Sequence, residues 1–348
     1  MEKKGNRLSN IELLRIVSML GIITLHYFHE DMGGVSTYAV FPNFIWIFSK
    51  ILQSMAVPLV NCFVLITGYF MISKKELSFR KPVELLLITV WYGLISYGIS
   101  ILCGVHTFSL SGFLYATIPF FEGKRWFVET YIILILLAPF MNKTLIYISK
   151  KTFELLLCIQ LLLFSVWYSV GLSAPLLDDG YGIINFITLY MIGSYLRLHG
   201  NSIRWISKSI WMGMVIYLGC SAITFCMGLF ENSFGYAFIT NIVGSVALFV
   251  IFLQMDFGSN KTINRISSYV FDVYFVHSDT NTSKLLFQNV LKSSSIGNNI
   301  LVLPHLLVTL PLIYLLGIVA GWLRKRIWKK SVGKWLNYSE FVNQKIEV

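Results

Sequence analysis

Ten apolar stretches, each near the length of a membrane-spanning helix, occupy most of this 348-residue chain. A helix needs about 20 mostly apolar residues to cross the hydrocarbon core of a bilayer. The stretches lie at 11–29, 44–71, 83–105, 126–148, 153–172, 182–198, 209–230, 236–255, 263–277 and 300–323. The sequence therefore predicts an all-α, polytopic membrane bundle of about ten helices, forming a single domain over residues 1–348.

Composition excludes the main soluble classes. The chain is 56% hydrophobic and 13% charged, whereas a soluble domain carries about a quarter charged residues. The net charge of +11 resembles that of a nucleic-acid-binding protein, but the basic residues are spread among short loops, as membrane topology requires. The five cysteines lie in apolar runs without a CxxC pair, so we expect neither a metal site nor a disulfide framework.

The distribution of Lys and Arg predicts the orientation. With the N-terminus inside, 22 of these residues fall on the cytoplasmic side and four on the outer side. Cytoplasmic loops of membrane proteins are enriched in Lys and Arg. We therefore expect both termini to be cytoplasmic.

Arg15 and His26 are ionisable residues inside the first apolar stretch. Such residues are costly in a membrane helix and mark a candidate functional site. Eleven residues make close to three helical turns, so both side chains project from nearly the same face, about 16 Å apart. The predicted orientation places Arg15 toward the cytoplasm and His26 toward the outer face. The alternatives are an Arg15 that snorkels to the membrane surface and a His26 that only packs within the bundle.

This first stretch resembles the first helix of the membrane acyltransferase 3 family, in which ten residues separate an Arg from a His. Three later segments resemble the family in the same order: Val57–Tyr69, with Pro58 before a run ending Thr67-Gly68-Tyr69; Arg125-Trp126-Phe127, with Tyr131 and Pro139; and Ser267–His277. One motif departs from the family pattern. The family often carries two basic residues three apart after its second span, whereas here the residue three positions after Arg80 is Val83. Lys81 and Lys75 would take over part of the role of the missing residue.

The resemblance implies a membrane O-acyltransferase, usually an acetyltransferase, in the plasma membrane of a bacterium. Its donor would be cytoplasmic acyl-CoA, used as a substrate with no bound cofactor. Its acceptor would be a sugar hydroxyl of a cell-envelope or exopolysaccharide, and a glycolipid or a peptidoglycan precursor is the alternative. A hydroxyl that attacks a thioester needs a base, and imidazole titrates near working pH. His26 is the catalytic candidate, as base or as a transient acyl-imidazole, and Arg15 is the candidate for the CoA phosphates.

Five further residues are candidates for substrate binding. Glu30 follows His26 by one helical turn and would orient the imidazole. Arg80 is carried over from the family's basic pair after the second span as a substrate-binding residue. His277 would help bind the acceptor near the outer face, and a structural role is its alternative.

Trp126 and Glu129 complete the candidate set, at the outer end of the fourth stretch. Trp126 would stack on an acceptor sugar that hydrogen-bonds to Glu129. The alternative is an interfacial Trp beside a Glu129 that pairs with Arg125 or Lys124.

Two other function classes stay open. A transporter or flippase for a glycan or lipid-linked sugar would share the many spans, but it would be expected to show repeated halves and more charge inside the membrane, and neither is apparent. A non-catalytic membrane scaffold is the third class. The identity of the acceptor sugar, the hydroxyl modified and the acyl chain stay open as well.

Overall fold

The structure is a computed structural model that describes residues 7–38, 43–118, 125–171, 178–200, 209–229, 233–256, 258–279, 281–297 and 299–348. The first half contains α1 (Ser9–Phe28), η1 (Ser36–Tyr38), α2 (Phe44–Met71), β1 (Glu76–Ser78), α3 (Arg80–Leu102), α4 (Leu110–Thr117), α5 (Trp126–Leu145), α6 (Lys150–Leu161), η2 (Leu162–Val166) and α7 (Trp167–Ser169). The second half contains α8 (Ile183–His199), α9 (Ile210–Met227), α10 (Ile239–Gln254), α11 (Lys261–Ser267), α12 (Val270–Ser278), η4 (Leu285–Val290), η5 (Ser293–Ile296), α13 (Val302–Trp328), α14 (Val332–Tyr338), α15 (Glu340–Asn343) and β2 (Lys345–Glu347).

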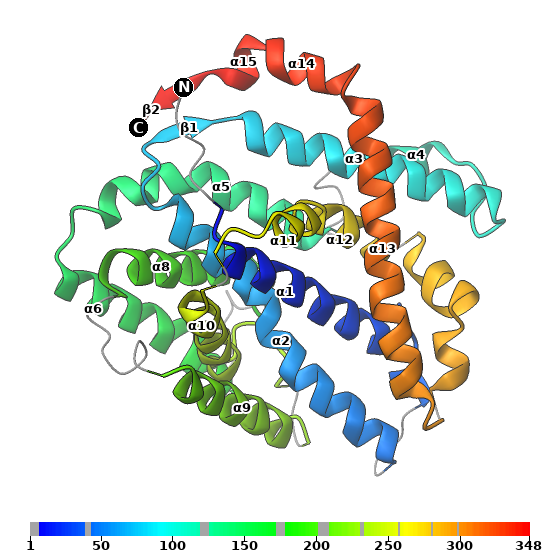
Figure 1. Cartoon of the computed structure of the whole chain (residues 1–348), viewed down its shortest axis with the longest axis horizontal. Coiled ribbons are helices and arrows are strands. Elements are labelled where there is room, and N and C mark those ends of the chain that lie inside the picture. Colours follow the sequence, from blue (N-terminus) through cyan, green and yellow to red (C-terminus); the bar gives the residue numbers. More distant parts are fainter. Residues whose placement is uncertain are drawn as a thin grey trace.

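Helices α1 and α2 run through the middle of the bundle, with α8, α9 and α10 on one side and α13 on the other (Figure 1). Every residue of α2 from Ala56 to Tyr69 is buried. A helix that is apolar on all faces must be enclosed by other helices. The two central helices therefore form a fixed frame that carries Arg15 and His26.

Seven described helices are long and apolar enough to cross a membrane: α1, α2, α3, α5, the run Lys150–Ser169, α9 and α13. Helices α8 and α10 are shorter, with 17 and 16 residues. The predicted stretch 263–277 is broken between α11 and α12, where the Ser268 hydroxyl donates to the Arg265 carbonyl. Serine side chains that bond the backbone compete with a continuing helix. The nine residues of α12 reach only about 14 Å, so the prediction of about ten spanning helices is not confirmed.

The all-α prediction missed a small sheet. Strand β1, after α2, pairs antiparallel with β2 at the C-terminus, with Leu77 opposite Ile346 (Figure 1). An ion pair of 2.8 Å joins Lys345 Nζ to Glu76. We call the end of the bundle that carries β1, β2 and Arg80 the β end. We call the other end, which carries His26 and the first turn of α5, the histidine end.

A buried ion pair, which the sequence analysis did not anticipate, joins three helices. Arg324 Nε of α13 lies 2.7 Å from Asp272 Oδ1 of α12, with side chains 5% and 2% exposed. The Tyr92 hydroxyl of α3 donates to the same carboxylate at 2.8 Å. The last apolar stretch was predicted to end at 323, which left Arg324 in a tail. Helix α13 continues to Trp328, and the guanidinium lies 4.7 Å from the Trp328 ring centroid.

Helices α2 and α8 approach closely at two glycines. A Cβ on Gly193 would lie 2.2 Å from the Leu65 carbonyl oxygen, and one on Gly68 would lie 2.1 Å from that of Tyr190. Small residues allow membrane helices to pack backbone against backbone. We expect Gly193→Ala to lower the free energy of unfolding by about 1–3 kcal/mol, the typical cost of overpacking.

The measurement is thermal unfolding of the purified variant in detergent. Gly219→Ala is the matched control, because no atom lies within 4 Å of the Cβ position of Gly219 in α9. Equal stability of the two variants would show that α2 and α8 can move apart to accept the methyl group without a loss in the free energy of unfolding.

Candidate functional site

The structure brings His277 of α12 against His26 of α1. Their ring centroids are 5.0 Å apart and the rings are tilted by 48°. His277 is fully buried, with Tyr274 and Phe287 rings at its edges, and His26 is half-buried. Two residues predicted separately for catalysis and for acceptor binding therefore form one histidine pair.

The hydrogen bonds of His277 indicate which nitrogen carries its proton. His277 Nδ1 lies 2.6 Å from the Val273 carbonyl oxygen, one turn earlier in α12. A carbonyl only accepts, so Nδ1 is the donor and Nε2 of the neutral ring keeps its lone pair. Neither His277 Nε2 nor His26 Nδ1 has a hydrogen-bond partner in the described part of the chain. Buried polar atoms are normally paired, so these two nitrogens mark the histidine pair as a candidate site.

A glycine turn fixes the end of α1 that carries His26. The helix ends at Phe28, and the amide of Gly33 then donates to the His26 carbonyl at 2.9 Å. Gly34 closes the turn with a φ of +71°, which glycine adopts without a steric penalty. Gln288 of η4 donates to the Met32 carbonyl at 3.0 Å. The last turn of α1 is thus held from two sides.

This early helix end separates Glu30 from the ring it was expected to orient. Glu30 lies in the turn after Phe28, outside the helix, and is exposed. Its carbonyl accepts a hydrogen bond from Gln288 at 3.4 Å. The prediction that Glu30 orients the His26 imidazole from the next helical turn is therefore not supported by the structure. The residue that contacts the His26 ring is His277 of α12.

Asp279 joins the end of α12 to the start of α5. Its carboxylate pairs with Arg125 at 2.9 Å, and the two side chains are 3% and 12% exposed. The Ser96 hydroxyl of α3 donates to the other carboxylate oxygen. Asp279 is two residues after His277, so this ion pair fixes the helix end that presents His277. The only signal of this role in the sequence is the position of Asp279 two residues after His277.

Trp126 follows Arg125 directly and lies in an aromatic cluster. Its ring stacks on Tyr236, with centroids 5.4 Å apart, and meets the edge of Tyr181 at 4.5 Å. Trp126 and Glu129 share the first turn of α5 and are both half-buried. Both lie at the histidine end, where an acceptor sugar was expected. Lys124, the other predicted partner of Glu129, lies outside the described residues.

Arg15 lies in a separate cavity of about 450 Å³ that opens at the β end. Arg80, Lys74 and Lys81 line the same cavity, against the two acids Glu76 and Glu84. Arg15 Nε has no hydrogen-bond partner in the described residues. Deeper in the cavity, the hydroxyls of Thr67 and Tyr131 lie 2.9 Å apart. Basic side chains around an unpaired guanidinium form a site suited to a multiply charged anion.

The pKa of Lys74 reflects its burial and the positive charge that gathers around this cavity. Desolvation, with the nearby charges of Lys81 and Lys345, lowers the pKa of the Lys74 amine from its usual value. A bound anion would relieve that repulsion. Arg80 donates to Asn343 and Asn337 of the C-terminal segment, both at 2.7 Å. Arg80, a predicted substrate-binding residue, therefore lies next to α14 and α15.

A comparison with protein-family models identifies the family of this chain. Residues 8–323 match the model of the acyltransferase 3 family, described as an acyltransferase domain. The chain belongs to the acyltransferase 3 family. This confirms the resemblance seen in the Arg15–His26 spacing and the three later segments, and it makes the protein a membrane acyltransferase. No curated protein and no solved structure matches the chain.

The two candidate residues that carry the family resemblance, Arg15 and His26, lie in two different sites of the protein. Arg15 and His26 share one helix of this acyltransferase, yet each lies in a different site. Their separation of about 16 Å along α1 divides the basic cavity from the histidine pair.

Proposed function

We propose that this acyltransferase is an O-acetyltransferase of the bacterial plasma membrane. It moves the acyl group of acyl-CoA to a sugar hydroxyl of a cell-envelope or exopolysaccharide. The observation that carries the proposal is the histidine pair, in which two rings 5.0 Å apart each hold a buried nitrogen that has no hydrogen-bond partner among the described residues. An imidazole with a free lone pair is a suitable base for a hydroxyl.

The reaction follows from these groups. The sugar oxygen attacks the thioester carbonyl carbon while its proton passes to an imidazole nitrogen. The carbon–sulfur bond then breaks, and the CoA sulfur takes that proton as it leaves. In a two-step form, a His26 nitrogen attacks the thioester carbon, the carbon–sulfur bond breaks and CoA leaves as the thiol with the imidazole proton. The sugar oxygen then attacks the acyl carbon, the nitrogen–carbon bond breaks, and the hydroxyl proton returns to the imidazole. Two adjacent rings support either form, since one ring takes the proton while the other contacts the acyl group.

Arg15 and Arg80 would hold the CoA phosphates in the basic cavity. Guanidinium groups bind phosphate with charge-assisted, often bidentate hydrogen bonds. The long pantetheine arm of CoA would span the separation between Arg15 and His26, so that the thioester reaches the histidine pair. Trp126 and Glu129 would bind the acceptor sugar from the other side of that pair.

We expect Arg15→Ala to raise the KM for acetyl-CoA about tenfold or more, because a hydrogen bond to a charged group contributes about 1.5–3 kcal/mol. The measurement is the rate of CoA thiol release by protein in nanodiscs, as a function of acetyl-CoA concentration. Lys143→Ala is the control, because Lys143 is an exposed cation at the end of α5 that does not line the cavity. An unchanged KM in Arg15→Ala, with His26→Ala inactive, would remove Arg15 from the donor site.

The function is tested in a deletion strain by mass spectrometry of its envelope polysaccharide. Loss of acetyl groups with normal polymer export, restored by the wild-type gene and not by the His26→Ala gene, supports the proposal. Loss of the whole polymer would instead indicate transport or polymerisation. Restoration by the His26→Ala gene would indicate a scaffold without catalysis.

A further inference from the structure

The C-terminal segment, residues 332–348, lies beyond the part of the chain that matches the family model, which ends at residue 323. It contains α14, α15 and β2, and it runs from the end of α13 across the β end of the bundle to strand β1 (Figure 1). The Phe341 ring stacks on the ring of Phe79 with centroids 5.2 Å apart, and Val342 is fully buried. The segment is therefore packed against the start of α3, although the family match does not include it.

This segment holds Arg80 at the mouth of the basic cavity. Two guanidinium nitrogens of Arg80 donate to the side-chain oxygens of Asn337 and Asn343, both at 2.7 Å. The Asn343 amide nitrogen donates in turn to the carbonyls of Leu336 and Ser339, both at 2.9 Å, which leaves its oxygen to face Arg80. Arg80 lines the cavity and is exposed. The two amides therefore fix the orientation of a cation that solvent and ligand can reach.

The partners of Arg80 are neutral amides, so they orient the guanidinium without cancelling its charge. Arg80 forms no ion pair among the described residues. A guanidinium has more N–H donors than these two amides use. The remaining donors and the full positive charge are available to an anion, which guanidinium groups bind through charge-assisted hydrogen bonds.

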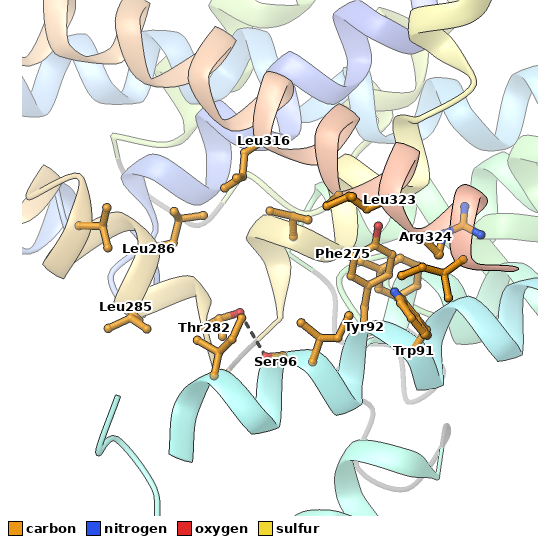
Figure 2. Close-up of a pocket in the computed structure, with 16 residues that line it drawn as sticks. Trp91, Tyr92, Ser96, Phe275, Thr282, Leu285, Leu286, Leu316, Leu323 and Arg324 are labelled. Carbon is orange, nitrogen blue, oxygen red and sulfur yellow. Dashed lines mark hydrogen bonds between the residues drawn. The ribbon is translucent and has the colours of Figure 1, made fainter. Parts of the chain in front are cut away.

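Arg324 shows the opposite arrangement. It lines a cavity of about 460 Å³ between α3, α12, η4 and α13, whose lining is mostly hydrocarbon (Figure 2). Its guanidinium donates to both carboxylate oxygens of Asp272, at 2.7 and 3.2 Å. A carboxylate cancels the charge of Arg324, as a buried structural ion pair requires. The amide partners of Arg80 instead suit a cation that binds a ligand.

Lys345 of the same segment acts on one of the acids of the basic cavity. Its amine lies 2.8 Å from the Glu76 carboxylate, and Glu76 lines the cavity. The ion pair offsets a negative charge that would repel an anion. The Lys345 charge also acts on Lys74 in the cavity lining. The segment therefore makes the cavity more positive as well as orienting Arg80.

We infer that the C-terminal segment is part of the donor site, with Asn337 and Asn343 as positioning residues that hold Arg80 toward the phosphate-bearing nucleotide end of the acyl donor. The inference rests on the proposed use of acyl-CoA and assigns new residues to its binding. If the segment only packed against α3, the charge of the groups that hold Arg80 would not affect donor binding.

The first test measures binding and does not depend on activity. The probe is adenosine 3′,5′-bisphosphate, titrated into the full-length protein in nanodiscs by isothermal titration calorimetry. Asn337→Asp keeps the side-chain size and an oxygen facing Arg80 but cancels the Arg80 charge. We expect the Kd to rise by about tenfold or more, the equivalent of about 1.4 kcal/mol, with no fall in the thermal unfolding midpoint. An unchanged Kd, or no binding by the wild-type protein, would overturn the inference.

The matched control is Gln344→Glu, which makes the same change from amide to carboxylate in the same segment. Gln344 is exposed and does not line the cavity. Exposed charges are screened by salt, so we expect the Kd to change by less than about twofold. A loss of affinity equal to that of Asn337→Asp would show a general effect of charge and would overturn the positioning role.

A double-mutant cycle tests whether Asn337 acts through Arg80. Arg80→Gln should weaken binding of the bisphosphate to a similar degree. Residues that act through one another are not additive, so Asn337→Asp should add little when Arg80 is already replaced. A full additional loss in the double variant would contradict the assignment.

Kinetics separate this inference from the proposed function. We expect Asn337→Asp to raise the KM for acetyl-CoA and to leave kcat unchanged, because Arg80 lies at the β end and the histidine pair at the other. A wild-type KM in Asn337→Asp, with acetyl transfer intact, would overturn the inference and leave the proposed function standing. No acetyl transfer by the wild-type protein, together with no acetyl loss in the deletion strain, would instead defeat the proposed function.

Discussion

Replacing His26 with Ala is expected to lower kcat for acetyl transfer by about 10²–10⁴-fold, the usual contribution of general acid–base catalysis. His26 is half-buried and meets His277 with ring centroids 5.0 Å apart, so its loss removes one of the two imidazoles that would act in the proposed mechanism. The measurement is transfer of radiolabelled acetyl from acetyl-CoA by purified protein in nanodiscs. Binding of acetyl-CoA should change little, because the basic cavity lies toward the other end of α1.

The control is His29→Ala, since His29 is exposed at the end of the same helix. It should retain the wild-type rate. His277→Ala should also lose activity, and His277→Gln should not restore it, since an amide cannot take up the proton at neutral pH. If His277→Ala were fully active, the histidine pair would be reduced to a single catalytic ring.

The second large effect concerns stability. Asp272→Asn is expected to lower the free energy of unfolding by about 3–5 kcal/mol, because it leaves the Arg324 charge buried without its counter-ion. The pair joins α12 to α13, and Tyr92 adds α3 through a 2.8 Å hydrogen bond. Chemical unfolding in detergent, followed by circular dichroism, measures the change.

Two controls distinguish charge burial from general damage. The double variant Asp272→Leu with Arg324→Met removes both charges and should recover most of the lost stability, since apolar replacements of buried pairs are often neutral. Glu154→Gln breaks the exposed Lys150–Glu154 pair, whose side chains are 43% and 47% exposed, and should have little effect. A double variant as unstable as Asp272→Asn would contradict an electrostatic origin.

The central features of the fold were predictable because they depend on local sequence. Apolar length predicted α1, α2, α3, α5, α9 and α13 within a few residues. The spacing of Arg15 and His26 on one helix needs only the helical repeat. The short strands β1 and β2 were missed, since three-residue strands far apart in the chain leave no periodic signal.

The tertiary parts of the site were not predictable in the same way. His277 was a candidate by itself, but its contact with His26 depends on how α12 packs against α1. Arg324 was counted among loop cations because it follows the last apolar stretch, whereas its partner Asp272 allows it to be buried. Charge counting cannot identify a cation that a distant carboxylate neutralises.

In the proposed mechanism, the donor enters at the β end and the acyl group is transferred at the histidine pair. Sidedness in membrane vesicles tests it most directly, with orientation read from protease access to the C-terminal segment that contains β2. Labelled acetyl-CoA added outside should support transfer only in vesicles that expose this segment, and only with His26 intact. Transfer in vesicles of the opposite orientation, or undiminished transfer by His26→Ala, would contradict the account.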